Sequence, residues 1–435
     1  MAQIFLDLFY SFGNCLNCFP GSPTLKINSR SFKILRLLGE GGFSYVYLVE
    51  DTASHQLFAL KKIRCPFGAE SVQQATREVD AYRLFAHVPT IISAVDHAVA
   101  TERGADEATK TVYILLPYYR RGNLQDMINA NIVNRGRFPE RHLMMLFLGV
   151  CKALRAMHEY KPGPAERMEM GNEEDQQMDG GPSSRSGRQM GTRGKRTEEQ
   201  EEPEQERPLM ESENQVSGSG KPQSYAHRDI KPGNIMIDDS GSTPILMDLG
   251  SVAPSPVPVT SQSLALQIQD AAAEHSTMPY RAPELFDVRT GTVIDTKSDI
   301  WSLGCTLYAC LVGKSPFEMR SDETGGTLSL CVLGGDWRFP DESPGGAKRA
   351  NSISQAKARA AASTGGPSDQ PGQADGAGGS GGGSGSGVTI SEPIREIVRR
   401  CLKVEPAERP DIGELIIMVE RIIEELPDGD GYGSP

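Results

Sequence analysis

The sequence has 435 residues, and its 45 Lys and Arg stand against 57 Asp and Glu, which gives a net charge of −12. A negative surface of this size repels phosphate backbones, so we expect no nucleic-acid partner. Hydrophobic residues make up 38% of the chain, below the globular share of about 45–50%, which indicates polar segments beside a compact fold.

The first part of the chain predicts mainly strands. Runs of β-branched and aromatic residues between turn residues predict strands at 32–42, 44–51, 56–63 and 111–119. One helix is expected among them, over 69–86, because an apolar face recurs at helical spacing through Val72, Ala75, Val79, Tyr82 and Phe85.

From residue 123 onward the pattern turns helical. Helices are predicted at 143–160 and 298–313, both apolar on more than one side, and amphipathic helices at 394–402 and 411–426. A small β-rich part followed by a larger helical part predicts an α+β fold built from two lobes.

Two segments interrupt this pattern. Residues 161–224 and 341–388 are dominated by Gly, Ser, Gln and charged residues, and they have too few apolar side chains to offset the entropy of ordering. We therefore predict two disordered insertions in one fold. Residues 1–27 and 427–435 are expected to be terminal tails.

The eight cysteines are scattered through the chain, mostly in apolar surroundings, which predicts reduced thiols and a cytoplasmic protein. No apolar run approaches the roughly 18–20 residues of a membrane-spanning helix. The first residues are apolar, but they lack the basic start of a secretory signal peptide.

A glycine-rich run, Gly39 to Val46, joins the first two predicted strands. Glycines let a backbone close over phosphates, and Val46 could cover the flat face of a base. A plain Gly-rich hairpin is the alternative interpretation of this run.

A lysine lies on the next apolar strand. Lys61 could serve as a cation for phosphate, with Glu78 on the following helix as the partner that orients its ammonium group. A surface ion pair is the alternative.

Two short motifs flank a predicted strand at 235–237: His227–Asn234 (HRDIKPGN) and Met247–Gly250 (MDLG). Phosphoryl transfer from Mg-ATP needs a carboxylate near the incoming hydroxyl, a cation near the transferred phosphate and oxygen ligands for the metal. These two motifs contain all three.

The order of the Gly-rich loop, AxK, helix Glu, HRDxKxxN, DxG and APE resembles the protein kinase family. The resemblance implies a bilobal kinase fold with an N-lobe and hinge at 28–120 and a C-lobe at 121–426. It also implies transfer of the γ-phosphate of ATP, with Mg²⁺, to Ser or Thr hydroxyls of protein substrates, including autophosphorylation. A lysine two residues after the catalytic Asp favours Ser/Thr over Tyr.

The resemblance also assigns roles to residues. Asp229 would accept the substrate hydroxyl proton, and Lys231 would screen the γ-phosphate. Asn234 and Asp248 would hold Mg²⁺. Lys61, fixed by the helix glutamate, would contact the α- and β-phosphates.

The nucleotide pocket follows from the same resemblance. Leu116 would be the gatekeeper of the hinge, and backbone groups of Pro117 and Tyr119 would hydrogen-bond adenine. The rest of the pocket would be formed by Leu38, Gly39, Glu40, Gly41, Gly42, Phe43, Ser44, Tyr45, Val46 and Ala59.

Three further residues are expected to be structural. Glu284 of the APE motif would pair with Arg409 as a buried ion pair, and Asp299 would brace the HRD backbone. Ser44 replaces the third glycine of the loop and Leu249 replaces the common Phe of DxG. Neither departure removes a charge or a metal ligand, and a catalytically inactive pseudokinase scaffold remains the alternative function.

A narrower resemblance is to the Numb-associated kinase family, in its myristoylated and palmitoylated Ser/Thr kinase branch, carried by GEGGFSYVYLVE, LLPYYRRGNL, MDLGS and YRAPELF. That family has an extra helix in the activation segment, which predicts a helix at Ser263–Glu274. Ser276 and Thr277 are candidate phosphorylation sites, with packing in the substrate pocket as the alternative.

The N-terminal run Gly13–Cys18 is similar to the lipidated start of that branch. Ala2 follows Met1, so myristoylation is not expected for this sequence unless the gene starts near Gly13. Palmitoylation of Cys15 and Cys18 would attach a monomeric protein to a cytosolic membrane surface such as the Golgi. A redox or zinc CxxC pair and a tail with two inert thiols are the alternatives.

Overall fold

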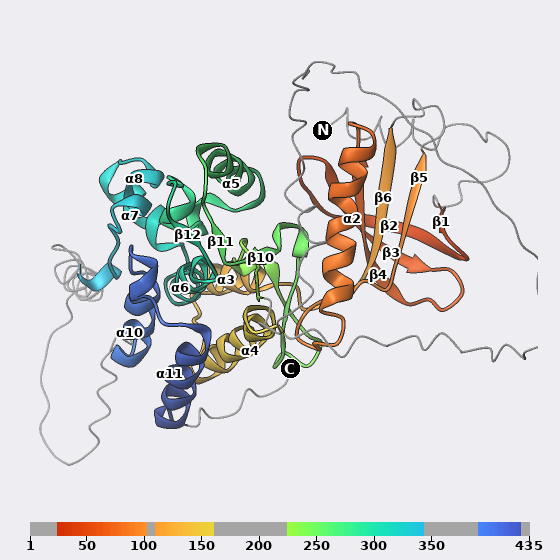
Figure 1. Ribbon diagram of the computed structural model, residues 1–435. Helices are drawn as coiled ribbons and strands as arrows, with labels where there is room; N and C mark the ends of the chain where they lie inside the picture. The colour runs from red at the N-terminus through yellow and green to blue at the C-terminus, as the bar shows by residue number, and fades with distance from the viewer. Residues whose placement is uncertain (1–23, 102–108, 161–223, 343–389, 428–435) are drawn as a thin grey trace, which may run out of the picture. The chain divides into compact units, whose positions relative to one another are not determined.

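The computed structural model describes residues 24–101, 109–160, 224–342 and 390–427. Within these ranges a β-rich part is followed by a helical part, which confirms the α+β prediction (Figure 1). Most of each predicted insertion lies outside the described residues, and so do the two cysteines of the N-terminal segment, Cys15 and Cys18.

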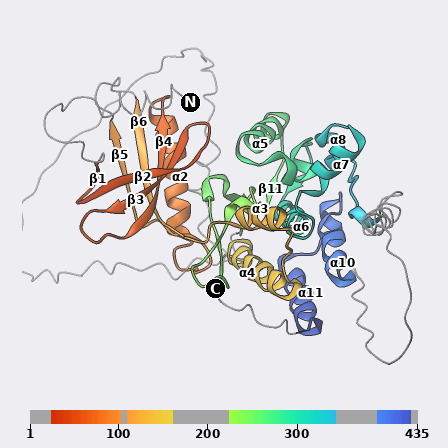
Figure 2. The same ribbon diagram turned by 180° about the vertical axis from the view of Figure 1, so that it is seen from behind.

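Six strands form one antiparallel sheet in the order β1-β2-β3-β4-β6-β5. Helix α2 (Ala69–Leu84) connects β4 to β5 and runs beside the sheet in both views (Figures 1 and 2). The strands are β1 (Thr24–Ile27), β2 (Arg30–Glu40), β3 (Ser44–Asp51), β4 (Leu57–Cys65), β5 (Asp96–Thr101) and β6 (Lys110–Pro117).

The alternation of side chains along β4 decides which residues face α2. Phe58 and Leu60 join a small core together with Leu115 of β6. Lys61 is the next residue after Leu60, so its side chain leaves the opposite face of the sheet. Val79 of α2 belongs to the larger core on that face. Because side chains alternate between the two faces along a strand, Lys61 points toward α2, the helix that carries Glu78.

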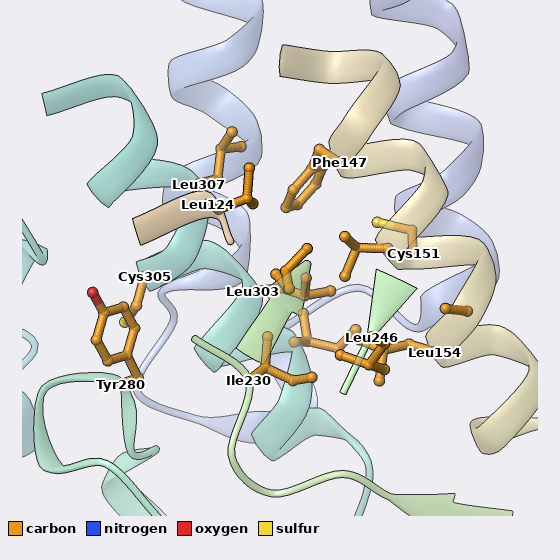
Figure 3. Close-up of a cluster of buried hydrophobic side chains, with 14 of the residues drawn as sticks. Leu124, Phe147, Cys151, Leu154, Ile230, Leu246, Tyr280, Leu303, Cys305 and Leu307 are labelled. Carbon is orange, nitrogen blue, oxygen red and sulfur yellow. The ribbon is translucent and has the colours of Figure 1, made fainter. Parts of the chain in front are cut away.

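Most of the helical part surrounds a single core. Figure 3 shows Phe147, Cys151 and Leu154 of α4 converging with Leu303 and other buried side chains. Helix α11 packs along α4, and α10 packs along α6. The helices are α3 (Leu124–Asn134), α4 (Glu140–His158), α5 (Gln262–His275), α6 (Lys297–Val312), α7 (Pro316–Thr324), α8 (Leu328–Leu333), α10 (Glu392–Cys401) and α11 (Ile412–Glu425).

The central helix α6 is buried on nearly every side from Ser298 to Cys310, as its lack of a polar face predicts. It ends at Gly313, whose φ of 99° is the left-handed conformation that glycine adopts without strain. Helix α11 begins with a capping box in which Asp411 and Glu414 satisfy each other's backbone N–H groups.

Helix α5 confirms the extra helix expected from the narrower resemblance. Its buried residues Ala265 and Ile268 pack against Leu285, Val288 and Ile294 in a separate small core. This core fixes α5 to the segment that follows the APE motif.

Three short antiparallel strand pairs complete the fold. The strand expected at 235–237 is present as β8. The pairs are β7 (Ser224–Ala226) with β10 (Ala253–Ser255), β8 (Ile235–Ile237) with β9 (Pro244–Leu246), and β11 (Val257–Pro258) with β12 (Val293–Ile294).

The structure corrects three predicted boundaries. The tail predicted at 1–27 is too long, because Thr24–Ile27 pairs with β2. The insertion predicted at 161–224 ends earlier, because Ser224 begins β7. The insertion predicted at 341–388 starts later, because Asp341 accepts two hydrogen bonds from Arg395. Composition does not predict these boundaries, because the polar residues there are held in place by partners that lie far away in the sequence.

No helix among the described residues has the length and apolar character needed to cross a bilayer. The six cysteines in this part of the chain are all buried, unpaired thiols, namely Cys65, Cys151, Cys305, Cys310, Cys331 and Cys401.

Candidate active site

The strand lysine and the helix glutamate form the expected pair. Lys61 Nζ lies 2.7 Å from Glu78 Oε1 and 2.9 Å from Oε2. It also lies 3.0 Å from Oδ1 of Asp248, whose motif is 187 positions further along the chain. One ammonium group thus joins β4, α2 and the loop after β9.

Electrostatics in this cluster favour charged side chains. Burial alone would lower the pKa of Lys61, but the charges of Glu78 and Asp248 outweigh it and raise that pKa. Burial alone would raise the pKa of Asp248, yet the neighbouring Lys61 leaves it below its ordinary value. Both shifts favour the charged forms of Lys61 and Asp248 at neutral pH, which suits a site for phosphate and a metal ion.

The β8–β9 hairpin brings the two predicted metal ligands to the same end. Asn234 immediately precedes β8 and Asp248 lies two positions after the end of β9, and these strands are antiparallel. The backbone N–H of Met247 donates to the carbonyl of Asn234 at 2.9 Å, which fixes this juxtaposition.

Asp229 is the centre of a second polar cluster. Its Oδ2 accepts from Lys231 Nζ at 2.8 Å and from Asn234 Nδ2 at 2.9 Å. Its Oδ1 accepts from the backbone N–H of Thr277 at 2.9 Å and from the Thr277 hydroxyl at 2.8 Å. The Lys231 ammonium also donates to that hydroxyl at 2.6 Å. These contacts hold the carboxylate in one orientation.

The donor set fits a hard divalent cation. Both hydrogen bonds from the Asn234 side chain leave through Nδ2, toward the carbonyl and Oδ2 of Asp229. This orients the amide so that Oδ1 is the end able to bind a metal. Together with the Asp248 carboxylate it offers two oxygen ligands, which matches Mg²⁺ sites that also use water and substrate phosphates.

Asp299 of α6 holds the backbone of the loop that carries Asp229. Asp299 accepts from the backbone N–H of His227 and of Arg228, both at 2.8 Å, and from His158 Nε2 at 2.9 Å. This is the role expected for Asp299, with His158 as an additional partner. Arg228 and Asp248 have φ of 68° and 63°, a strained left-handed backbone for residues other than glycine. The hydrogen bond from the Arg228 N–H to Asp299 helps to hold Arg228 in this conformation.

The expected structural ion pair is also present. Glu284 accepts from Arg409 Nη1 at 2.7 Å and Nη2 at 2.8 Å. The remaining N–H groups of Arg409 donate to the carbonyls of Lys297, Lys403 and Val404. Every donor of this buried guanidinium is used.

Several of the residues predicted to hold the nucleotide lie on one face of the central strands β3, β4 and β6. Val46 is paired with Gly39 on one side and Lys61 on the other. Ala59 is paired with Leu116, one step further along the same face. A side chain added at Gly39 or Gly42 would meet no atom within 4 Å, so the glycines leave open space above this row.

The tip of the glycine-rich loop carries Phe43, which is 54% exposed and packs edge-on against Phe67. The remaining predicted loop residues lie where β2 turns into β3, with Leu38 at an irregularity in the strand pairing. They are Leu38, Glu40, Gly41, Ser44 and Tyr45.

The predicted hinge begins at the end of β6. Pro117 is the last residue of β6 and pairs with Phe58 of β4. Tyr119 lies two positions further along the chain, between β6 and α3. Burial and the charges of Asp238 and Asp239 raise the pKa of Tyr119.

The sequence of the chain matches the protein kinase domain family over residues 32–161 and 222–418. The chain belongs to this family.

Named relatives agree with this assignment. Serine/threonine-protein kinase ppk13 of Schizosaccharomyces pombe is 34% identical over 321 residues, 73% of this chain and 82% of that protein. Serine/threonine-protein kinase ENV7 of Saccharomyces cerevisiae is 29% identical over 430 residues, 97% of this chain and 99% of its own. Human serine/threonine-protein kinase 16 is 33% identical over 316 residues, 72% of this chain and 80% of its own. These names support a Ser/Thr protein kinase, whereas the Numb-associated branch stays a prediction.

Sequence reasoning missed three residues of the kinase site. Tyr82 donates to Glu78 Oε1 at 2.7 Å, and its position four residues after Glu78 on a helix could have revealed it. His158, the partner of Asp299, ends an apolar helix and left no signal. Thr277 was considered for phosphorylation, not for its contact with Asp229.

The two candidate phosphorylation sites are both engaged in the structure. The Thr277 hydroxyl lies between Asp229 and Lys231, and the Ser276 hydroxyl donates to the carbonyl of Ala272 at 2.6 Å. Arg281 Nε donates to the Ser276 hydroxyl at 2.7 Å. Packing therefore accounts for both hydroxyls, and their phosphorylation remains a prediction.

Proposed function

We propose that this protein transfers the γ-phosphate of Mg-ATP to Ser and Thr hydroxyls of protein substrates. The observation that carries the proposal is the convergence of Lys61, Asp229, Asn234 and Asp248 on two adjoining clusters. A scaffold that only bound partner proteins would not need these four side chains to be held together.

At the nucleotide end, Lys61 would bind the α- and β-phosphates while Glu78 keeps its ammonium in place. Asn234 and Asp248 would hold Mg²⁺. A bound Mg²⁺ would supply positive charge that stabilises the negative charge of the phosphates during transfer. Leu116 and Ala59 would line the adenine pocket, and backbone groups of Pro117 and Tyr119 would bind its edge.

At the acceptor end, a substrate Ser or Thr hydroxyl would donate its hydrogen bond to Asp229. As its oxygen forms a bond to the γ-phosphorus, the bond from that phosphorus to the β,γ-bridging oxygen breaks, and the hydroxyl proton passes to the Asp229 carboxylate. Lys231 would neutralise charge on the transferred group. Assistance of this kind accelerates transfer by roughly 10²–10⁴-fold.

An assay on a generic protein substrate tests this function. Asp229→Asn should reduce phosphate transfer by at least about 10²-fold and leave nucleotide binding intact, because it removes the base but keeps the side-chain shape. Asp287→Asn, the same change at an exposed aspartate outside both clusters, should retain full activity. No transfer by the unmodified protein would favour the pseudokinase scaffold.

We also propose autophosphorylation on Ser or Thr. The chain has Ser- and Thr-containing segments outside the described residues, including 182–217 and 352–364, that can serve as acceptors. Phosphosites present after incubation with Mg-ATP and absent from the Asp229→Asn protein would support it.

For location, we propose a cytoplasmic, monomeric kinase attached peripherally to the Golgi or another endomembrane through palmitoylated Cys15 and Cys18. The support is the sequence: two cysteines follow an apolar run that includes Phe9 and Phe12. In a membrane fractionation, the Cys15→Ser, Cys18→Ser protein should appear in the soluble fraction. Unchanged sedimentation with membranes would refute the proposal.

A further inference from the structure

A side-chain hydrogen bond connects the catalytic helix α2 to the activation-segment helix α5. The amide of Gln74 donates to Nε2 of His275 at 3.0 Å, across 201 positions of sequence. His275 is the last residue of α5, and Gln74 is exposed on α2. Nothing in the catalytic roles assigned above uses either residue.

The position of Gln74 relative to Glu78 gives this bond a consequence. The two residues are four apart in a continuous helix, so they lie one above the other on the same face. A contact that holds Gln74 therefore constrains the turn from which Glu78 reaches Lys61. At the N-terminus of α2, Gly68 provides no side-chain cap, and the Ser71 hydroxyl accepts from the backbone N–H of Phe67 at 3.1 Å.

Helix α5 is firmly held at the other end of the contact. Ala265 and Ile268 pack in the small core with Leu285 and Val288. Arg281 Nη2 donates to the carbonyls of Ala273 and Ser276, at 3.4 Å and 3.1 Å, just where the helix ends. His275 is thus presented from a fixed element, which makes it a suitable anchor for the exposed face of α2 that carries Gln74.

We propose that Gln74 and His275 are positioning residues, which hold α2 in the placement where Glu78 engages Lys61. The inference rests on the proposed kinase function, and it assigns to α5 the task of orienting the nucleotide end of the site. Neither side chain touches the reacting groups. Both act through Glu78 and the orientation of the Lys61 ammonium.

A single solvent-exposed hydrogen bond has a limited effect. Its loss should raise the KM for Mg-ATP and lower kcat/KM by about two- to tenfold. Because the site itself is unaltered, the residual activity should keep its dependence on Asp229. The melting temperature should stay close to that of the unmodified protein, since both side chains are at least partly exposed.

The test compares full-length Gln74→Ala with Gln73→Ala. Both remove an exposed glutamine from the interior of the same helix, so their effects on helix propensity are equal. Gln74→Ala and His275→Ala should each raise the KM for ATP, and the double variant should be no worse than either single variant. Gln73→Ala and, on α5, Gln267→Ala should behave like the unmodified protein. Gln74→Glu combined with His275→Lys should recover the loss through an ion pair.

Hydrogen exchange provides a readout that does not depend on activity. Amides around Glu78 should exchange faster in Gln74→Ala than in Gln73→Ala, with or without phosphate transfer by the protein. Equal exchange in the two variants, or additive losses in the double variant, would overturn the positioning role. Absence of transfer by the unmodified protein, with the exchange difference retained, would overturn the proposed function and leave the mechanical link standing.

Discussion

Two ionic networks in this kinase contain the same kinds of side chain but differ in exposure. The network at Arg409 is closed: its guanidinium is fully buried and all five donors are bonded within the protein. The network at Lys61 is open, because the Asp248 side chain is 37% exposed. An ion pair closed on itself stabilises a fold, whereas one with an open member can exchange partners with a ligand.

Asp229 and Asp299, the α6 residue that braces its loop, repeat this contrast. Asp299 is completely buried and braces the backbone. Asp229 retains some exposure and is oriented by side chains that would also face a substrate. The four predictions that follow test whether closed networks affect stability and open ones affect catalysis.

The largest expected effect is on the closed network. Arg409→Leu should reduce the free energy of unfolding by about 3–5 kcal/mol, because it leaves Glu284 without its cation and three carbonyls without donors. Chemical denaturation measures the loss. Molecules that remain folded should keep the unmodified kcat. Arg421→Leu, which removes an exposed pair with Glu425, should change the free energy of unfolding by no more than about 0.5 kcal/mol.

Asp248→Asn addresses the open network. It removes a metal ligand and a charge beside Lys61, so kcat should fall by about 10²–10³-fold. The free energy of unfolding should change far less than in Arg409→Leu, because the side chain is partly in water. A thermal melt and an activity assay on one preparation decide this. A large loss of stability with little loss of activity would invert the comparison.

Thr277→Val tests the orientation of Asp229. The variant keeps the shape of the side chain but removes a hydroxyl that donates to Asp229 and accepts from Lys231. We expect kcat to fall by about tenfold or more, since hydrogen bonds to charged groups are worth roughly 1.5–3 kcal/mol. Thr277→Ser should retain most of the activity. Equal activity of the two variants would show that the hydroxyl does not orient the base.

The smallest effect concerns Asp341, a half-exposed carboxylate that pairs with the buried Arg395. The hydrogen bonds from Arg395 hold the pKa of Asp341 below its ordinary value of 3.8. The carboxylate therefore stabilises the fold above pH 3.8, and this contribution is lost as pH falls through the lower, folded-state pKa. Asp341→Asn should cost no more than about 1 kcal/mol at pH 7, and the difference from the unmodified protein should shrink toward pH 3. Unfolding curves at both pH values check it.

Much of the site follows from sequence because its chemistry is tied to motifs. The contact of Lys61 with Glu78 was predictable from an apolar strand and a following helix. The contacts of Asp299 and Glu284 followed from the resemblance to kinases. In each case the residue type has few alternatives, since another side chain could not supply the same charge and reach.

Other features depend on partners that local sequence does not reveal. Thr24–Ile27 is a strand because β2 pairs with it, and Asp341 is ordered because Arg395 reaches it. The contact of Gln74 with His275 joins two polar residues from different lobes, and no periodicity marks either one. Tyr82 is the exception, because its position four residues after Glu78 on a helix predicts their contact.

The most direct test of the central claim is incubation of the purified protein with Mg-ATP, followed by mass-spectrometric mapping of new phosphosites, beside the Asp229→Asn protein. The account predicts phosphate on Ser or Thr in the unmodified protein and none in the variant. Equal phosphorylation of both, or none on the protein and none on a generic substrate, would contradict it.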